Sequence, residues 1–83
     1  MNLEIGKVYK TQSGRLIKIV NHDPEWSGGM YWGSSIDNQE PKLDHERWTP
    51  DARWWSYISP FSMFGFQELR NEKLNLIEEV VVN

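Results

Sequence analysis

The sequence predicts one mainly β domain over residues 1–83, folded as a small antiparallel barrel or strongly bent sheet of about five strands. Three observations predict it: a hairpin pattern at residues 4–20, several short runs of aromatic and β-branched residues, and turn signals between those runs. A barrel like that of SH3 domains is one such arrangement. The sequence of residues 61–73 also allows a short helix. At 83 residues, the chain can bury one modest core.

The hairpin at residues 4–20 is predicted to turn at residues 12–14, Gln-Ser-Gly. A three-residue hairpin loop needs one residue at positive φ, and the final glycine adopts that conformation without a Cβ clash. In the second strand, Ile17 and Ile19 share one face while Lys18 points the other way. We therefore expect the two isoleucines to lie in the core.

Further short strands are predicted after Pro24, at residues 30–34 (with a possible extension to 36), 47–49, 53–58 and 74–82. Residues 37–46 are polar except for Leu43 and predict a long loop. Residues 67–73 are charged and predict a helix or a loop. Apolar residues also recur at helical spacing through residues 66–80, but the valines at 80–82 favour a strand because their branched side chains restrict χ1 in a helix.

Composition limits the chemistry that is available. The sequence has no cysteine, which excludes disulfides, cysteine-ligated zinc and thiol catalysis. This usage is typical of a reducing cytoplasm. No secretory leader and no apolar run long enough to span a membrane is visible, so we expect a cytoplasmic protein without a membrane partner.

The charge is unevenly distributed. The net charge of the chain is −3, which is not typical of a nucleic-acid-binding protein. Residues 1–20 nevertheless carry four basic side chains against one acidic one. If the protein bound phosphate groups, these would be the candidate ligands: Lys7, Lys10, Arg15 and Lys18.

No catalytic or metal-binding constellation is predicted. His22 lies beside Asp23, and His45 lies between Asp44 and Glu46, but neither histidine has the close spacing on one element that zinc sites show. No serine lies in a strand-to-helix elbow, and the carboxylates of residues 37–46 do not match a calcium-binding loop. We expect no enzyme activity, metal or cofactor.

The aromatic residues are the most informative feature. The chain has eleven of them, five of which are tryptophans, and a core of this size needs only part of that number. In the strand at residues 53–58, Trp55 and Tyr57 fall on one face and Trp54 on the other. Exposed Trp and Tyr are typical of binding hot spots. The predicted protein-binding patch consists of Trp26, Trp32, Trp54 and Tyr57, rimmed by Asp44 and Glu46.

Three short segments resemble a known group. Residues 8–15 resemble a Y-[RK]-T-x-[DS]-G-R hairpin, residues 48–54 a W-T-x-D-G-R-[WY] turn, and residues 76–80 a closing D-L-[VI]-E-E-V strand. In this order they are similar to small phage-encoded or prophage-encoded proteins of unassigned function, over about a third of the chain. The resemblance implies a compact antiparallel β domain and a phage setting. Ala52 departs from the glycine of the pattern, so that turn either avoids positive φ or carries strain.

Together these observations predict a non-enzymatic phage accessory protein that binds a host or phage protein, for example as an inhibitor of a host factor or defence system. Contact between copies of the chain is a second form of protein binding. The alternative is a nucleotide or single-stranded nucleic-acid binder that stacks bases on its aromatics and meets phosphate with the basic hairpin.

Overall fold

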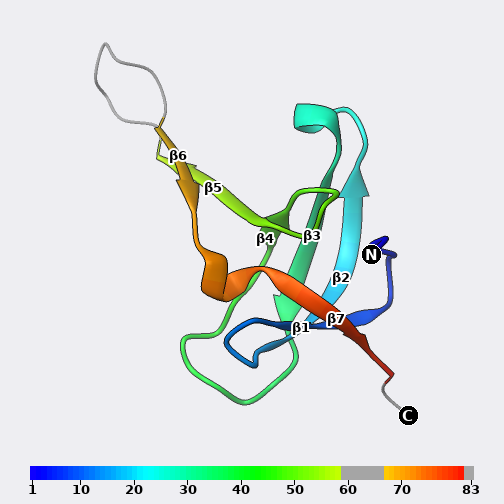
Figure 1. The fold of residues 1–83 in the computed structure, drawn as a ribbon, viewed down its shortest axis with the longest axis vertical. Helices are drawn as coiled ribbons and strands as arrows, with labels where there is room; N and C mark the ends of the chain where they lie inside the picture. Colours follow the sequence, from blue (N-terminus) through cyan, green and yellow to red (C-terminus); the bar gives the residue numbers. More distant parts are fainter. Residues whose placement is uncertain (59–66, 82–83) are drawn as a thin grey trace.

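The computed structural model describes residues 1–58 and 67–81, and these form one curled antiparallel sheet of seven strands, a half-barrel (Figure 1). Across the sheet the order is β6-β5-β4-β3-β2-β1-β7. The strands are β1 (Val8–Thr11), β2 (Leu16–Asp23), β3 (Met30–Ser35), β4 (Glu46–Trp48), β5 (Trp54–Ile58), β6 (Gln67–Arg70) and β7 (Leu76–Val80). Two single-turn 3₁₀ helices, η1 (Trp26–Gly28) and η2 (Glu72–Leu74), precede β3 and β7.

The predicted N-terminal hairpin is confirmed. β1 pairs with β2, with Tyr9 opposite Ile17, and Gly14 has φ +91° in the connecting turn. Ile17 and Ile19 are fully buried, as their alternation with Lys18 predicts. β2 continues to Asp23, three residues beyond the expected end, because its register shifts after Ile19 and it stays paired with β3.

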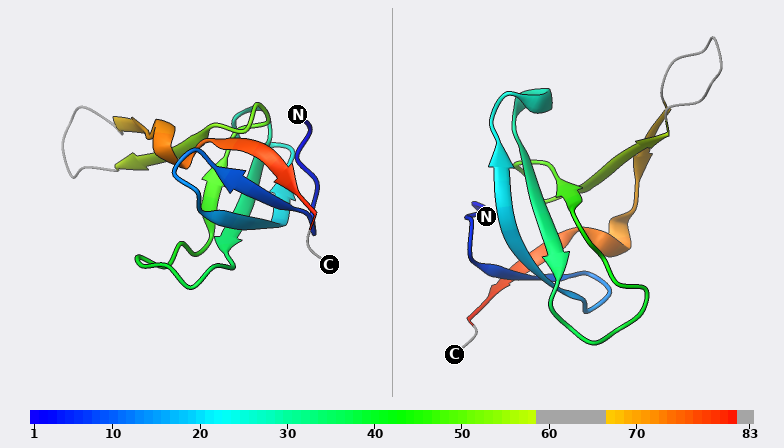
Figure 2. Two further views of the ribbon diagram at one scale, coloured as in Figure 1. Left: turned by 60° about the horizontal axis from the view of Figure 1, so that its bottom comes forward. Right: turned by 180° about the vertical axis from the view of Figure 1, so that it is seen from behind.

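The core shows why the sheet curls. Tyr9 and Leu76, from β1 and β7, belong to the same buried cluster as Trp48 and Ala52, although β7 and β4 are four strands apart in the sheet. The chain after β6 crosses back through η2 to reach β1 (Figures 1 and 2). On this path, the Trp48 indole Nε1 donates a hydrogen bond of 2.7 Å to the Leu74 carbonyl, and the Leu76 amide donates one of 2.9 Å to the Ala52 carbonyl. These contacts hold the curl closed on its core side.

The polar loop predicted at residues 37–46 is confirmed over residues 37–45, whereas Glu46 begins β4, and the loop is anchored at two points. Leu43 is buried, and its amide donates a hydrogen bond of 3.0 Å to the Ser35 hydroxyl. Asp37, at the start of the loop, forms a buried ion pair with Arg15. The single apolar residue of the loop therefore joins the core.

The predicted mainly β fold with a strongly bent antiparallel sheet is confirmed, with seven strands where about five were expected. The expectation for residues 67–73 is wrong, because residues 67–70 form β6 instead of a helix or a loop. The reason is pairing with β5, which places Arg70 opposite Trp55 and Glu68 opposite Tyr57 and overrides the weak local preference of a charged segment. Of the short helix considered at residues 61–73, residues 61–66 lie outside the described residues, and η2 is a single 3₁₀ turn. The last strand is confirmed as β7, within narrower bounds than expected.

The sequence left open whether the turn at Ala52 avoids a positive φ or carries strain, and the structure shows the strained conformation. Its φ is +68°, in the left-handed region that costs a non-glycine residue about 1–2 kcal/mol. Its side chain is 4% exposed and packs in the core cluster, which offsets part of that cost. The turn thus combines a glycine-like backbone with a methyl group that the core uses.

Gly33 in β3 is closely packed on its core side, and we predict that Gly33→Ala destabilises the fold. A Cβ at this position would lie 2.7 Å from Ile17 Cγ2 and 3.1 Å from both the Lys18 carbonyl oxygen and Trp48 Cζ3. Overpacking of this kind should lower the free energy of unfolding by about 1–3 kcal/mol in a urea titration. Val20→Ala, on an exposed side chain, serves as control and should change it by less than about 0.5 kcal/mol. An unchanged midpoint for Gly33→Ala would contradict this packing.

Candidate functional site

Strand alternation places a row of basic and aromatic side chains on the face of the sheet opposite the core. Trp32 in β3 lies opposite Arg47 in β4, Arg47 lies opposite Trp55 in β5, and Trp55 lies opposite Arg70 in β6. The neighbouring residues Trp48 and Trp54 form the corresponding pair on the core side. Because alternate residues of a strand point to opposite faces, each strand contributes to both surfaces.

Four aromatic rings surround the guanidinium of Arg47. The Arg47 Cζ lies 5.1 Å from the ring centroid of Trp26, 5.0 Å from that of Trp32, 5.7 Å from that of Trp55 and 5.2 Å from that of Tyr57. All four distances are within the range of cation–π attraction. We call these five residues, Trp26, Trp32, Arg47, Trp55 and Tyr57, the Arg47 cluster.

The rings of the Arg47 cluster also contact one another across two separate parts of the fold. Trp26 belongs to η1, at the end of the β2–β3 hairpin, whereas Trp55 and Tyr57 belong to β5. These two parts rise on either side of β4 (Figures 1 and 2). The Trp26 ring lies 5.9 Å from the Trp55 ring and 6.4 Å from the Tyr57 ring, with edge-to-face geometry in both pairs. Side chains therefore connect η1 to β5, although their backbones diverge.

The cluster lies at the surface and its cation has no carboxylate partner among the described residues. Trp55 is 8% exposed and Tyr57 is 38% exposed, while Trp26, Trp32 and Arg47 are half-buried. The Arg47 Nε is buried and has no hydrogen-bond acceptor in the described part of the chain. The aromatic faces are the groups that surround this N–H, and π faces accept weak hydrogen bonds. The guanidinium is thus held in place by rings instead of by anions.

The structure assembles three of the four predicted patch aromatics. Trp26, Trp32 and Tyr57 lie in the Arg47 cluster, whereas Trp54 packs against the core cluster on the other face. Its place is taken by Trp55. The alternation of residues 53–58 already separated Trp54 from Tyr57, so that signal was present in the sequence. Arg47 was not predicted, because nothing in its sequence neighbourhood distinguishes it from a solvated strand arginine.

The two predicted acidic rim residues lie elsewhere. Asp44 is exposed in the loop before β4, accepts a hydrogen bond of 3.1 Å from the Ser34 hydroxyl, and lies 3.5 Å from His45. Glu46 is opposite Gly33 and two residues from Trp48, so it belongs to the core-side face of β4. Neither residue has an interaction with the Arg47 cluster among the contacts described.

Most of the basic hairpin is neutralised by internal ion pairs. Lys7 pairs with Glu4 and with Glu79, the latter at 3.3 Å, and these carboxylates raise the pKa of Lys7. Lys10 lies 3.8 Å from Glu78. The only one of the four predicted phosphate ligands without an ion pair in the described part of the chain is Lys18, which is exposed. The four side chains thus do not form an open basic surface.

Arg15 is the most constrained of these four residues. Its Nε and Nη2 donate hydrogen bonds of 3.0 and 3.1 Å to the two carboxylate oxygens of Asp37, and both side chains are about 10% exposed. The Leu16 amide also donates to Asp37, at 2.9 Å. The Arg15 guanidinium, followed by the backbone donors, holds the pKa of Asp37 below its ordinary value of 3.8. Arg15 anchors the 37–46 loop.

The histidines have structural contacts. His22 stacks on Tyr31, with ring centroids 4.1 Å apart and planes 10° apart. His45 is exposed beside Asp44 and has φ +52°. Residues 1–58 and 67–81 contain no group of three or more metal-ligating side chains that could hold an ion.

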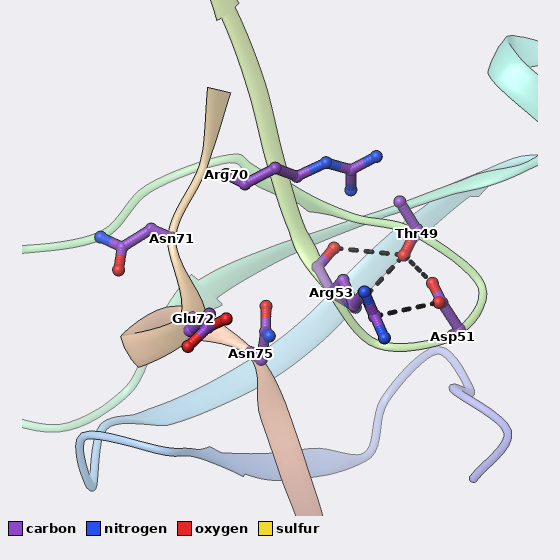
Figure 3. A pocket seen from close by; sticks show the side chains of 7 residues that line it. All are labelled: Thr49, Asp51, Arg53, Arg70, Asn71, Glu72 and Asn75. Atoms are coloured by element: carbon purple, nitrogen blue, oxygen red, sulfur yellow. Dashed lines mark hydrogen bonds and ion pairs between the residues drawn. The ribbon is translucent and has the colours of Figure 1, made fainter. Parts of the chain in front are cut away.

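A polar pocket of about 460 Å³ lies between the β4–β5 turn and the end of β6 (Figure 3). Its lining residues are Thr49, Asp51, Arg53, Arg70, Asn71, Glu72 and Asn75. Arg53 pairs with Asp51 at 3.3 Å, and Arg70 pairs with Glu68. The Thr49 hydroxyl donates to Asp51 and lowers the pKa of that carboxyl. Because both arginines of this pocket are paired with carboxylates of the chain, it has weaker anion-binding features than the Arg47 cluster.

Comparisons of the chain with protein-family profiles, curated proteins and solved structures gave no match. No described helix has the length and apolar character needed to cross a bilayer. The geometry of the described residues is therefore the basis for the functional proposal.

We predict that Asp37→Asn removes a pH-dependent part of the stability. Because the folded pKa of Asp37 is lowered, the ion pair stabilises the fold above the unfolded pKa of about 3.9, and this contribution is lost as the pH falls through the folded value. At pH 7 the variant should lose about 2 kcal/mol of unfolding free energy, and the difference from wild type should shrink below about pH 4.

Denaturant titrations between pH 2 and 7 measure this difference. Asp44→Asn is the control, because its side chain is 73% exposed beside His45 and should contribute less than about 1 kcal/mol. A pH-independent difference between wild type and Asp37→Asn would contradict the assignment.

Proposed function

We propose that the protein is a non-enzymatic binding protein whose Arg47 cluster docks on a protein partner. One observation carries the proposal: every residue of the cluster is Trp, Tyr or Arg, the three types enriched in interface hot spots. The five side chains gather on the face opposite the core, and all of them except Trp55 reach the surface.

Preorganisation supports the same function. The rings are fixed by contacts with one another and with the guanidinium, so docking would cost little additional side-chain entropy. Trp26, Trp32 and Tyr57 remain accessible for contact with a partner. The core cluster already contains Trp48 and Tyr9, and the rings of the Arg47 cluster lie outside it.

The resemblance of the three short motifs to phage-encoded proteins supports a host or phage protein as the partner, and the absence of cysteine supports a cytoplasmic setting. A target among host factors or defence proteins follows from that setting. The nucleic-acid alternative has weaker support, because Lys7, Lys10 and Arg15 are ion-paired and the net charge is −3.

The test compares wild type with a Trp26→Ala, Tyr57→Ala double variant. Partners captured from lysate of the host are identified and purified, and their Kd for each protein is measured. We expect the double variant to bind at least about 30-fold more weakly, as for a hot-spot pair, while a circular dichroism spectrum confirms that it folds.

The matched control is Ile77→Ala, which removes a side chain 55% exposed on β7, and it should leave the Kd unchanged. Binding to a single-stranded oligonucleotide that falls steeply with salt, without a protein partner, would favour the alternative. Protein partners whose Kd is the same for the double variant would contradict the proposal.

A further inference from the structure

Arg47 is the one arginine of this chain without a carboxylate partner among the described residues. The chain has four arginines, and the structure pairs the other three internally: Arg15 with Asp37, Arg53 with Asp51 and Arg70 with Glu68. Arg47 instead has four aromatic rings around it. Its charge therefore remains available to an anion from outside the chain.

The surroundings of Arg47 favour a tight contact with such an anion. Its Nε is buried against the rings, so water solvates the cation on only part of its surface. Apolar surroundings lower the local dielectric constant and strengthen an ion pair relative to one in bulk water. The side chain is half-buried, so its outer part reaches the surface beside Trp26, Trp32 and Tyr57.

A carboxylate fits this site better than a nucleotide does. A guanidinium fixed in one orientation presents a planar edge that matches the two oxygens of a carboxylate. A nucleic-acid strand would need open ring faces and several unpaired cations, but each ring of the Arg47 cluster already directs a face towards Arg47 and most of the basic hairpin is paired. Charge complementarity thus points to an acidic side chain among apolar neighbours.

We propose, building on the protein-binding function proposed above, that the partner contributes an Asp or Glu carboxylate to the guanidinium of Arg47 and apolar side chains to the surrounding rings. The occupant of this face is a segment of another protein with an acidic residue between aromatic or aliphatic ones. Arg47 acts as the specificity-determining residue, because an uncharged segment would leave its cation desolvated and unpaired.

The test is selection of a random twelve-residue peptide library on the immobilised full-length protein. Selected peptides are synthesised, and their Kd is measured against wild type, Arg47→Gln, Arg47→Lys and the Trp26→Ala, Tyr57→Ala variant, each checked by circular dichroism. We expect a shared Asp or Glu flanked by apolar residues. Changing that residue to Asn or Gln should weaken binding to wild type about tenfold or more, but should have little effect on binding to Arg47→Gln.

Arg47→Lys keeps the charge but loses the planar edge, so it should retain only part of the affinity. Peptides that depend on Trp26 and Tyr57 but lack an acidic residue, or that bind Arg47→Gln equally well, would overturn this inference and leave the proposed function standing.

A library without any binder that depends on the cluster would also overturn this inference alone, because the proposed function has its own test in the capture experiment. Self-association that the double variant abolishes, without any peptide binding, would overturn this inference and make a second copy of the chain the protein partner. A single-stranded oligonucleotide that competes for the cluster with a steep salt dependence would overturn both proposals.

Discussion

The cation–π contacts of Arg47 with four aromatic rings hold together the side chains on the face of the sheet opposite the core. The hydrophobic core cluster lies on one side of the curled sheet, around Trp48. On the other side the Arg47 guanidinium connects rings from η1, β3 and β5. Each such contact contributes about 0.5–1 kcal/mol at an exposed site and about 2 kcal/mol when desolvated. The guanidinium adds to the contacts of the Trp26 ring with the Trp55 and Tyr57 rings, which also connect η1 to β5.

Two adjacent residues of β4 organise the two faces of the sheet. Trp48 points to the core, where its indole donates a hydrogen bond to the chain that returns through η2, and this contact closes the curl. Arg47 points to the opposite face, where the rings of the Arg47 cluster surround its guanidinium. Because the same short strand organises both faces, the rigidity of the core is transmitted to the proposed binding surface. A surface that is fixed in this way lowers the entropic cost of docking on a partner.

The sequence allowed good prediction where the pattern was local. The glycine turn, the burial of Ile17 and Ile19, and the excess of aromatic rings over what the core needs all follow from spacing and composition. The choice of Trp55 over Trp54 was also available from alternation. The pairing of Arg15 with Asp37, the addition of β6 to the sheet and the position of Arg47 among four rings depend on contacts between distant residues. No local signal distinguishes those residues from solvated ones.

The enclosure of Arg47 is tested most directly by the NMR resonance of its Nε–H group. Assignment by comparison with Arg47→Lys identifies that signal among the four arginines. If the rings surround the guanidinium, ring currents should move the Arg47 signal upfield of the signals of Arg15, Arg53 and Arg70, and burial should slow its exchange with water. A signal at the position of a solvated arginine, exchanging as fast as that of exposed Arg53, would contradict the account.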